Sequence, residues 1–228
     1  MFRLLMRKGI FPLVWRTAHI TPIPKGPLSS SPSDYRPISI TPVISKVFEK
    51  LIASRLSKYL ESSGLVSSQQ FAYRKGLGTC DALLTVNDIC QKALDAGQEV
   101  RLVQIDFSAA FDRVNHAGIT YKLQEVGIGG SVLKILQEYL SNRSQTVFVD
   151  GQPSRSVDVV SGVPQGSVLG PLMFNIYTRE LSSILENIFV GYADDSTLLA
   201  VVPSPKSRVS VARSLIRDLV RVHAWCEL

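Results

Sequence analysis

The chain has 228 residues, of which 45% are hydrophobic and 19% charged, so it is long enough for one large or two small domains and too apolar to be disordered. Its net charge of +6 is unevenly spread, because residues 1–75 hold 12 of the 25 Lys and Arg residues but only 3 of the 19 Asp and Glu residues. This asymmetry favours a polyanion bound by the basic part and a metal held by the acidic part, although solvated helix faces explain the charge equally well.

The composition also bears on the compartment. Three scattered cysteines, Cys80, Cys90 and Cys226, lack metal-ligand spacing and indicate a reduced intracellular protein, nuclear or cytoplasmic. Basic residues interrupt the first apolar run, which argues against a secretory signal. The longest charge-free run, residues 159–178, contains prolines, glycines and polar residues, so we expect a soluble protein without a membrane partner.

The first half of the chain changes from extended to helical patterns. Residues 10–42 are rich in Pro, Ser and Thr, which predicts strands and loops. A 3.6-residue apolar period then predicts a helix capped by Thr41 and ended by Gly64. A second helix is expected over residues 79–94, and a buried strand over residues 99–107. The predicted buried face of the second helix consists of Leu83, Val86, Ile89, Cys90 and Ala93.

The second half begins with helices, a hairpin and a loop. Helices are expected near residues 116–126 and 131–140, followed by a hairpin that turns at Asp150-Gly151. The Gly- and Pro-rich loop "SGVPQGS" comes next, with Ser167 as the cap of a helix that extends to about Leu181.

The last elements complete a mixed order. Residues 187–202 predict two strands joined by a tight turn with Asp194 and Asp195 at its tip, and residues 206–225 predict a final helix. The predicted buried face of that helix consists of Val209, Ala212, Leu215, Ile216 and Leu219. The order of elements predicts an α+β fold with an antiparallel sheet flanked by helices.

Three carboxylates stand out because adjacent like charges between apolar runs are costly. Asp194 and Asp195 lie in "GYADDST", and Asp106 ends the apolar strand of "VQIDFSAAFD". If the three meet on one sheet, they need cations. Carboxylate oxygens suit Mg²⁺, and two ions about 3.5–4 Å apart serve in-line phosphoryl transfer.

Each aspartate also has a plain structural explanation. An Asp-Asp pair is common in hairpin turns, and Asp106 could be a helix cap. Asp112 is better explained as such a structural residue than as a catalytic one. Taken singly, these explanations are stronger than catalysis, so the surrounding sequence has to decide.

Six segments in order resemble the reverse transcriptases of non-LTR (LINE-like) retrotransposons. "VQIDFSAAFDRVNH", "SGVPQGSVLGPLMFNIY" and "GYADDSTLLA" resemble three successive catalytic motifs. "WRTAHITPIPKG", "DYRPISITPVISKVFEKLIASRL" and "SQQFAYRKGLGTCDALL" resemble the fingers region. The resemblance implies the right-hand polymerase architecture, with a fingers-like basic region over residues 1–98 and a palm-like catalytic region over residues 99–228, the two interleaved. The thumb and the last palm motifs are expected to be absent.

The resemblance assigns the metal and nucleotide sites residue by residue. Asp106 and Asp194 would be the main Mg²⁺ ligands, Asp195 the third catalytic carboxylate, and the carbonyl of Phe107 a further ligand, with Mn²⁺ as a substitute ion. Phe111 stands where the family has its steric gate against ribose, although spacing alone favours a core aromatic. The other implied nucleotide contacts are Gln165, Gly166, Arg36, Lys46 and Arg74. Tyr192 and Lys75 would contact template or primer. For Lys25, Arg55 and Lys75, a solvated face explains the residue as well as a template contact does.

The activity that follows is RNA-directed DNA polymerisation. Its partners would be an RNA template, a DNA primer and deoxynucleoside triphosphates, and the reaction a two-metal attack of the primer 3′-hydroxyl on the α-phosphate. One alternative is a catalytically inactive nucleic-acid-binding remnant of a truncated retroelement. Another is an RNA polymerase of the same palm architecture, which the bulky Phe111 and the Tyr-Ala pair before the aspartates disfavour.

Overall fold

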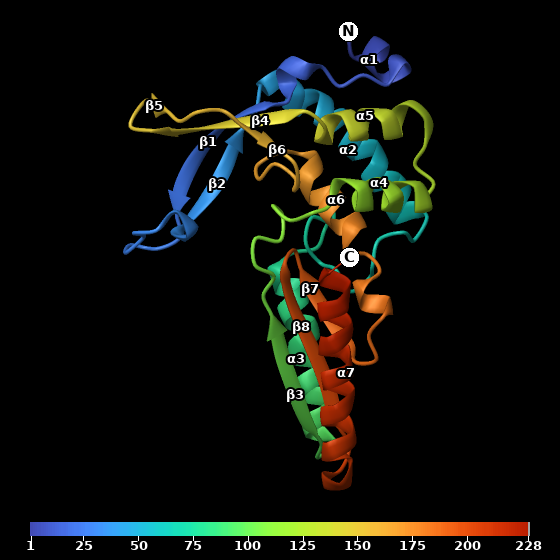
Figure 1. The fold of residues 1–228 in the computed structure, drawn as a ribbon. Helices are drawn as coiled ribbons and strands as arrows, with labels where there is room; N and C mark the ends of the chain where they lie inside the picture. The colour runs from blue at the N-terminus through green and yellow to red at the C-terminus, as the bar shows by residue number, and fades with distance from the viewer. Residues whose placement is uncertain (228) are drawn as a thin grey trace. The chain divides into compact units, whose positions relative to one another are not determined.

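The computed structural model describes residues 1–227 and divides the chain into two compact units (Figure 1). Unit 1 consists of Met1–Ser63 and Ala109–Tyr177, and unit 2 of Gly64–Ser108 and Thr178–Leu228. Each unit therefore uses two separate stretches of the chain. Both units combine helices with sheet, which confirms the α+β class, and none of the helices in the described part is long and apolar enough to cross a membrane. The assignment of fingers and palm to parts of the chain stays a prediction.

Unit 1 is built on a five-stranded sheet. Its strands are β1 (Thr17–Pro24), β2 (Tyr35–Ile40), β4 (Arg143–Val149), β5 (Gln152–Pro153) and β6 (Val157–Val159). Its helices are α1 (Phe2–Lys8), α2 (Val43–Ser62), α4 (His116–Glu125), α5 (Gly130–Leu140) and α6 (Leu169–Tyr177), with short 3₁₀ turns at Leu13–Trp15 and Pro32–Asp34. The strand order is β2-β1-β4-β5, with β6 also paired to β4. Only the β1–β4 pair is parallel among the described strands, so the predicted antiparallel sheet is largely confirmed.

The predicted elements of unit 1 are present, and α1 is an additional helix that was not predicted. One helix end and one cap were wrong: the helix after Ser167 ends at Tyr177 rather than near Leu181. The hairpin turns at Asp150 and Gly151, both in left-handed conformation, as a two-residue hairpin turn requires. Thr41 is not the cap of α2, because Pro42 occupies the N-cap position and the Thr41 hydroxyl is buried without a hydrogen-bond partner. The proline side chain has no oxygen that could accept from the N–H groups of the first turn, so the helix begins without a side-chain cap.

Unit 2 is a three-stranded antiparallel sheet between two helices. It contains α3 (Thr79–Asp95), β3 (Glu99–Ile105), β7 (Ile188–Tyr192), β8 (Asp195–Val202) and α7 (Arg208–Cys226), with 3₁₀ turns at Leu181–Ser183 and Pro205–Ser207. The strand order is β3-β8-β7. Alternate strand residues face opposite helices: Leu198 shares a core cluster with Leu215 of α7, and Leu199 shares one with Ala82 of α3.

Three burial predictions in unit 2 are wrong. β3 is an edge strand rather than a buried one, and Leu102 is 45% exposed on it. Leu83 is exposed, because its neighbour Ala82 occupies the position that faces the sheet. The rest of the covering face of α3 is as predicted: Val86, Ile89, Cys90 and Ala93. On α7, Val209, Ile216 and Leu219 are exposed. Leu215 is buried as predicted, but Asp218 and Val222 are buried beside it and were not predicted.

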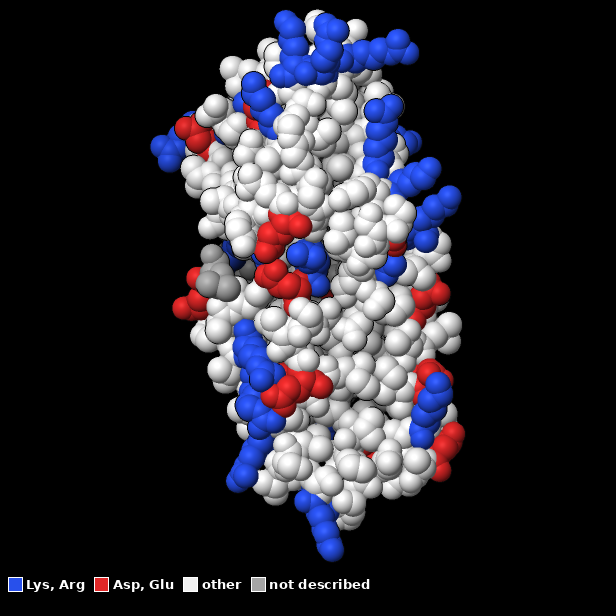
Figure 2. All heavy atoms as spheres, turned by 90° about the vertical axis from the view of Figure 1, so that its right-hand side faces the viewer, with Lys and Arg blue, Asp and Glu red and all other residues white. Residues whose placement is uncertain are grey.

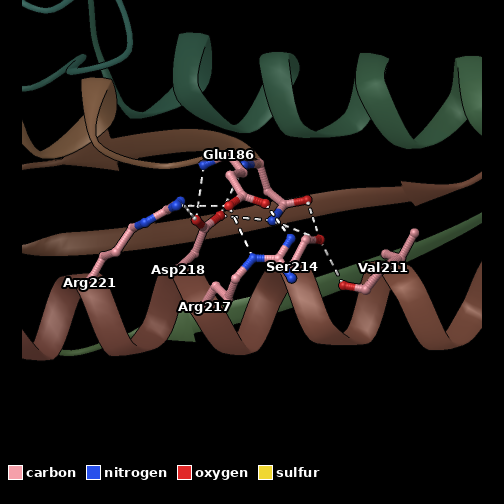
Figure 3. A network of polar contacts seen from close by, with 7 residues as sticks. Glu186, Val211, Ser214, Arg217, Asp218 and Arg221 are labelled. Carbon is pink, nitrogen blue, oxygen red and sulfur yellow. Dashed lines mark hydrogen bonds and ion pairs between the residues drawn. The ribbon is translucent and has the colours of Figure 1, made fainter.

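The reason for the shifted α7 face is a polar network around Asp218, which is fully buried (Figure 3). Its carboxylate accepts hydrogen bonds from the backbone N–H groups of Glu186 and Asn187, both at 2.9 Å, and from the Asn187 side chain at 2.7 Å. Arg221 adds an ion pair at 3.1 Å. Hydropathy alone places an aspartate outside, whereas these donors satisfy the buried charge and fix the start of β7.

Glu186 predicts a pH dependence of stability. Its hydrogen bond with Arg217, supplemented by Arg221, lowers the pKa of Glu186 from 4.5 to about 2. A carboxylate with a lowered folded-state pKa stabilises the fold above its unfolded-state pKa, and that contribution is lost as the pH falls from about 4.5 toward 2. We expect Glu186→Gln to lower the urea midpoint at pH 7, and we expect this deficit to shrink below pH 4.5 and to vanish only below about pH 2. A deficit that does not shrink on acidification would contradict this assignment.

Candidate functional site

The three candidate catalytic carboxylates lie at one end of the unit 2 sheet. Asp106 directly follows Ile105, the last residue of β3, which pairs with Ser196 of β8. Asp195 is the first residue of β8 and pairs with Tyr192, so only Ala193 and Asp194 form the turn. The predicted tight turn is thus confirmed, with Asp195 placed on the strand rather than at the tip. Asp106 and Asp195 are exposed and Asp194 is half-buried.

The fit of this sheet end to a cation depends on its donors. Carboxylate oxygens are the hard ligands that Mg²⁺ takes in proteins, and a cation would offset the repulsion between neighbouring aspartates. Over residues 1–227, however, no three His, Cys, Asp or Glu side chains stand close enough together to form a metal site. The three aspartates therefore suit Mg²⁺ by their oxygen donors and by their common position at one end of the sheet, and not as an assembled group of ligands.

Aromatic residues flank the carboxylates and anchor them to the core. The Phe107 ring packs against the cluster under α7 and lies edge-on to Trp225 at 6.3 Å between ring centres. Tyr192 packs against the cluster under α3. Burial raises the pKa of the Tyr73 phenol, and electrostatic interactions with Asp194 and Tyr192 raise it further. Tyr73 is therefore a neighbour of the turn.

A second candidate region, in unit 1, is the loop that carries Gln165 and Gly166. The Gln165 side-chain amide donates to both carboxylate oxygens of Asp112, at 2.9 and 3.0 Å, and the Gln165 backbone carbonyl accepts from the Ser39 N–H at 2.7 Å. The loop borders a cavity of about 350 Å³ between the sheet and residues 161–165. Asp112 was expected to be a structural residue such as a cap, but Asn115 caps α4, and Asp112 instead orients Gln165.

Buried polar groups of unit 1 hold this loop against the next helix. The Glu49 carboxylate, completely buried on α2, accepts hydrogen bonds from the N–H groups of Val168 and Leu169 at the start of α6. The Ser167 hydroxyl accepts from the Gly170 N–H, as predicted, and from the Tyr139 hydroxyl. A carboxylate at a helix N-terminus satisfies unpaired N–H groups and complements the helix dipole.

Gly162 provides a test of how tightly the loop is built. Its φ of +82° is left-handed, and an added Cβ would lie 2.6 Å from the Asp112 carbonyl oxygen. We expect Gly162→Ala to destabilise the chain by about 2–4 kcal/mol, because a backbone clash adds to the conformational strain. The measurement is urea denaturation. Gly64→Ala is the matched control: φ is +63° with no atom within 4 Å, so its cost should be about 1 kcal/mol. Equal losses in the two variants would show that the clash relaxes.

The predicted nucleotide contacts are divided between the two units. Phe111, in unit 1, is half-buried and stacks on Phe174 with 4.4 Å between ring centres. It therefore has a packing role in addition to the predicted role as a steric gate. Arg36 is exposed on β2 and Lys46 is half-buried on α2, also in unit 1. Arg74, in unit 2, donates to the carbonyls of Ser67 and Gln70. The candidate template contact Lys75 is exposed in the same unit.

The charge asymmetry of the sequence becomes a difference between units. Unit 1 holds 15 Lys and Arg against 8 Asp and Glu residues, a net charge of +7, whereas unit 2 holds 10 against 11. In Figure 2, basic side chains stand out at the end of unit 1 that carries α1, with few acidic ones beside them. A surplus of this kind attracts a polyanion.

Sequence reasoning missed two side chains that support the candidate regions, Glu49 and Gln70. Glu49 lies within a helical period on α2, where it reads as a surface residue, and Gln70 lies in an irregular segment. Gln70 is 5% exposed and bonds to the backbone of Ala193 in the aspartate turn. Neither has a local sequence signal, because their partners are about 120 residues away.

Comparisons with known proteins agree with the geometry. Residues 23–227 match the family model described as reverse transcriptase (RNA-dependent DNA polymerase). The probable RNA-directed DNA polymerase from transposon X-element of Drosophila melanogaster is 34% identical over 85% of this chain and 22% of its own length. The RNA-directed DNA polymerase from mobile element jockey, from the same organism, is 29% identical over 99% of this chain and 25% of its own length. The chain thus spans about a quarter of such relatives.

Solved structures support the fold. Telomerase from Candida albicans, in complex with a TWJ fragment of telomeric RNA, has a TM-score of 0.61 at 14% identity and covers 96% of this chain and 40% of its own. Apo telomerase from Candida tropicalis, truncated from its C-terminal domain, has a TM-score of 0.59 at 11% identity, covering 92% and 47%. These likenesses confirm the polymerase right-hand fold. With a family model that matches nearly its whole length, this chain belongs to the reverse transcriptase family, and its curated relatives are polymerases of non-LTR retrotransposons.

Proposed function

We propose that this chain is the catalytic part of an RNA-directed DNA polymerase that adds deoxynucleotides to a primer 3′-hydroxyl. The observation that carries the proposal is the common position of Asp106, Asp194 and Asp195 at one end of the unit 2 sheet, in a chain of the reverse transcriptase family. A carboxylate group of this kind is what two-metal nucleotidyl transfer requires.

Within the proposal, Asp106 and Asp194 would hold Mg²⁺ with help from the Phe107 carbonyl, and Asp195 would be the third carboxylate. Bound Mg²⁺ would supply charge stabilisation for the phosphates and lower the pKa of the attacking hydroxyl. The protein groups fix the direction of the carboxylates: Asp194 through the turn, Asp195 through its pairing with Tyr192, and Asp106 through the Phe107 side chain packed in the core.

The nucleotide would contact the Gln165 loop. Asp112 holds the Gln165 amide in one orientation, and Gly166 leaves its backbone open to a ligand. Phe111 would exclude the ribose 2′-hydroxyl, and Arg36, Lys46 and Arg74 would bind the triphosphate. The positive charge of unit 1 supports an RNA template and DNA primer as partners, with Lys75 and Tyr192 as contacts on unit 2.

The test is extension of a labelled DNA primer on an RNA template with Mg²⁺ and each of the two nucleotide classes. Extension with deoxynucleotides is expected. A preference for ribonucleotides would instead indicate an RNA polymerase. Salt-dependent template binding without incorporation would indicate a binding remnant.

A further inference from the structure

The segment Gln69–Phe71 is joined to the strand that leads into the aspartate turn. The Gly191 N–H donates to the Gln69 carbonyl at 2.8 Å, and the Phe71 N–H donates to the Gly191 carbonyl at 2.9 Å. Gln70 thereby forms a parallel bridge with Gly191 on the free edge of β7. This places the Gln70 side chain, 5% exposed, against the backbone of the turn.

The Gln70 amide takes both backbone polar groups of a single turn residue. Its Oε1 accepts from the Ala193 N–H at 2.9 Å, and its Nε2 donates to the Ala193 carbonyl at 3.2 Å. Oε1 also accepts from the Ala72 N–H at 3.1 Å, which fixes the amide on its own segment. The side chain therefore acts as a two-point clamp between the segment and the turn.

The clamped residue is in a conformation that alanine avoids. Ala193 has φ +58°, in the left-handed region, where the Cβ crowds the backbone and glycine is preferred. Strain of this kind persists only where surrounding groups impose it. Gly191 makes room for the clamp, because a Cβ there would lie 3.1 Å from Gln70 Nε2 and 2.9 Å from the Phe189 ring.

We propose that Gln70 is a positioning residue that holds Ala193 in its left-handed conformation and so sets the direction of the next residue, Asp194. The inference rests on the proposed function for its catalytic meaning, because Asp194 is the residue positioned. A side chain that orients a metal ligand without touching the metal commonly changes metal affinity or activity about 10- to 100-fold.

The test uses the 228-residue chain with Gln70→Leu, which keeps the bulk and removes the amide. Gln69→Leu is the matched control, a neighbouring glutamine that joins the same bridge through its backbone. Three quantities are measured: amide hydrogen exchange at Ala193, the dissociation constant for Mn²⁺ by electron paramagnetic resonance, and kcat and KM for deoxynucleotide addition. For Gln70→Leu we expect about 10-fold faster exchange, about 10-fold weaker Mn²⁺ binding and a fall in kcat at nearly constant KM.

A second-site change separates positioning from general loss of structure. Ala193→Gly relaxes the left-handed strain, so in the Gln70→Leu background it should restore Mn²⁺ affinity at least partly. Mn²⁺ affinity in Gln70→Leu within twofold of wild type would overturn the proposal, as would equal losses in the Gln69→Leu control. If the wild type binds Mn²⁺ but extends no primer, the polymerase proposal fails while the Mn²⁺ comparison still decides the role of Gln70. A wild type that binds no Mn²⁺ overturns both.

Discussion

Asp194→Asn is expected to lower primer extension on an RNA template by about 10³-fold, equivalent to ~4 kcal/mol of lost transition-state stabilisation. The substitution replaces one carboxylate oxygen with an N–H₂ group, which repels a cation and leaves the turn almost unchanged in shape. Asp194 is half-buried between Ala193 and the first residue of β8, so the turn backbone fixes the position from which its side chain extends. The measurements are single-turnover extension and Mn²⁺ affinity.

The matched control is Asp95→Asn, at the end of α3 in the same unit, where the side chain is exposed and accepts only from Gln91 among the bonds described for it. It should leave extension within about twofold, because exposed surface changes rarely exceed ~0.5 kcal/mol. The denaturation midpoint of Asp194→Asn is measured as well, so that a loss of extension can be separated from a loss of folding. Extension that survives Asp194→Asn unchanged would remove this turn from the proposed mechanism.

The sequence predicted the residues of the candidate site better than the side chains that hold those residues in place. Asp106, Asp194 and Asp195 could be placed at one sheet end because a strand end and a tight turn are both local patterns. The supporting groups are not local: Gln70 reaches Ala193, and Glu49 reaches Val168, across more than 100 residues. No periodicity reports such a contact, so a polar residue of this kind is assigned to the surface by default.

Burial errors in the fold have a related cause. The predicted elements are of the right type, although α1 was not predicted, but Leu83 and Ile216 were placed inside and lie exposed. On α7, the apolar face predicted from the sequence lies next to the buried face of the helix, because the buried face contains Asp218. A hydropathy pattern counts an aspartate against burial, whereas the structure compensates its charge with hydrogen bonds. Similarly, β3 is apolar enough for a central strand, yet the strand order leaves it at an edge.

Asp218→Ala is expected to destabilise the chain by about 3–5 kcal/mol, the usual cost of removing one partner from a buried charged network. The variant leaves the N–H groups of Glu186 and Asn187 without their acceptor, and it removes the ion pair between Arg221 and Asp218 within α7. Urea denaturation at pH 7 measures the loss. Asp218→Asn keeps one oxygen and should lose less, whereas Glu227→Ala, on an exposed carboxylate of the same unit, should lose under about 0.5 kcal/mol.

The same network links stability to the proposed chemistry. Asp218 fixes the residues just before β7, and the other end of β7 carries Gly191 and Tyr192, which lead into the aspartate turn. A strand that has lost its anchor at one end has more freedom at the other, since β7 is an edge strand held only by β8 and the Gln70 bridge among the described strand pairings. We therefore expect Asp218→Ala to speed amide exchange along β7 and to lower extension even under conditions where the chain stays folded. Unfolding free energies of Asp218→Ala and Glu227→Ala within 1 kcal/mol of each other would show that the buried carboxylate is not what holds β7 in place.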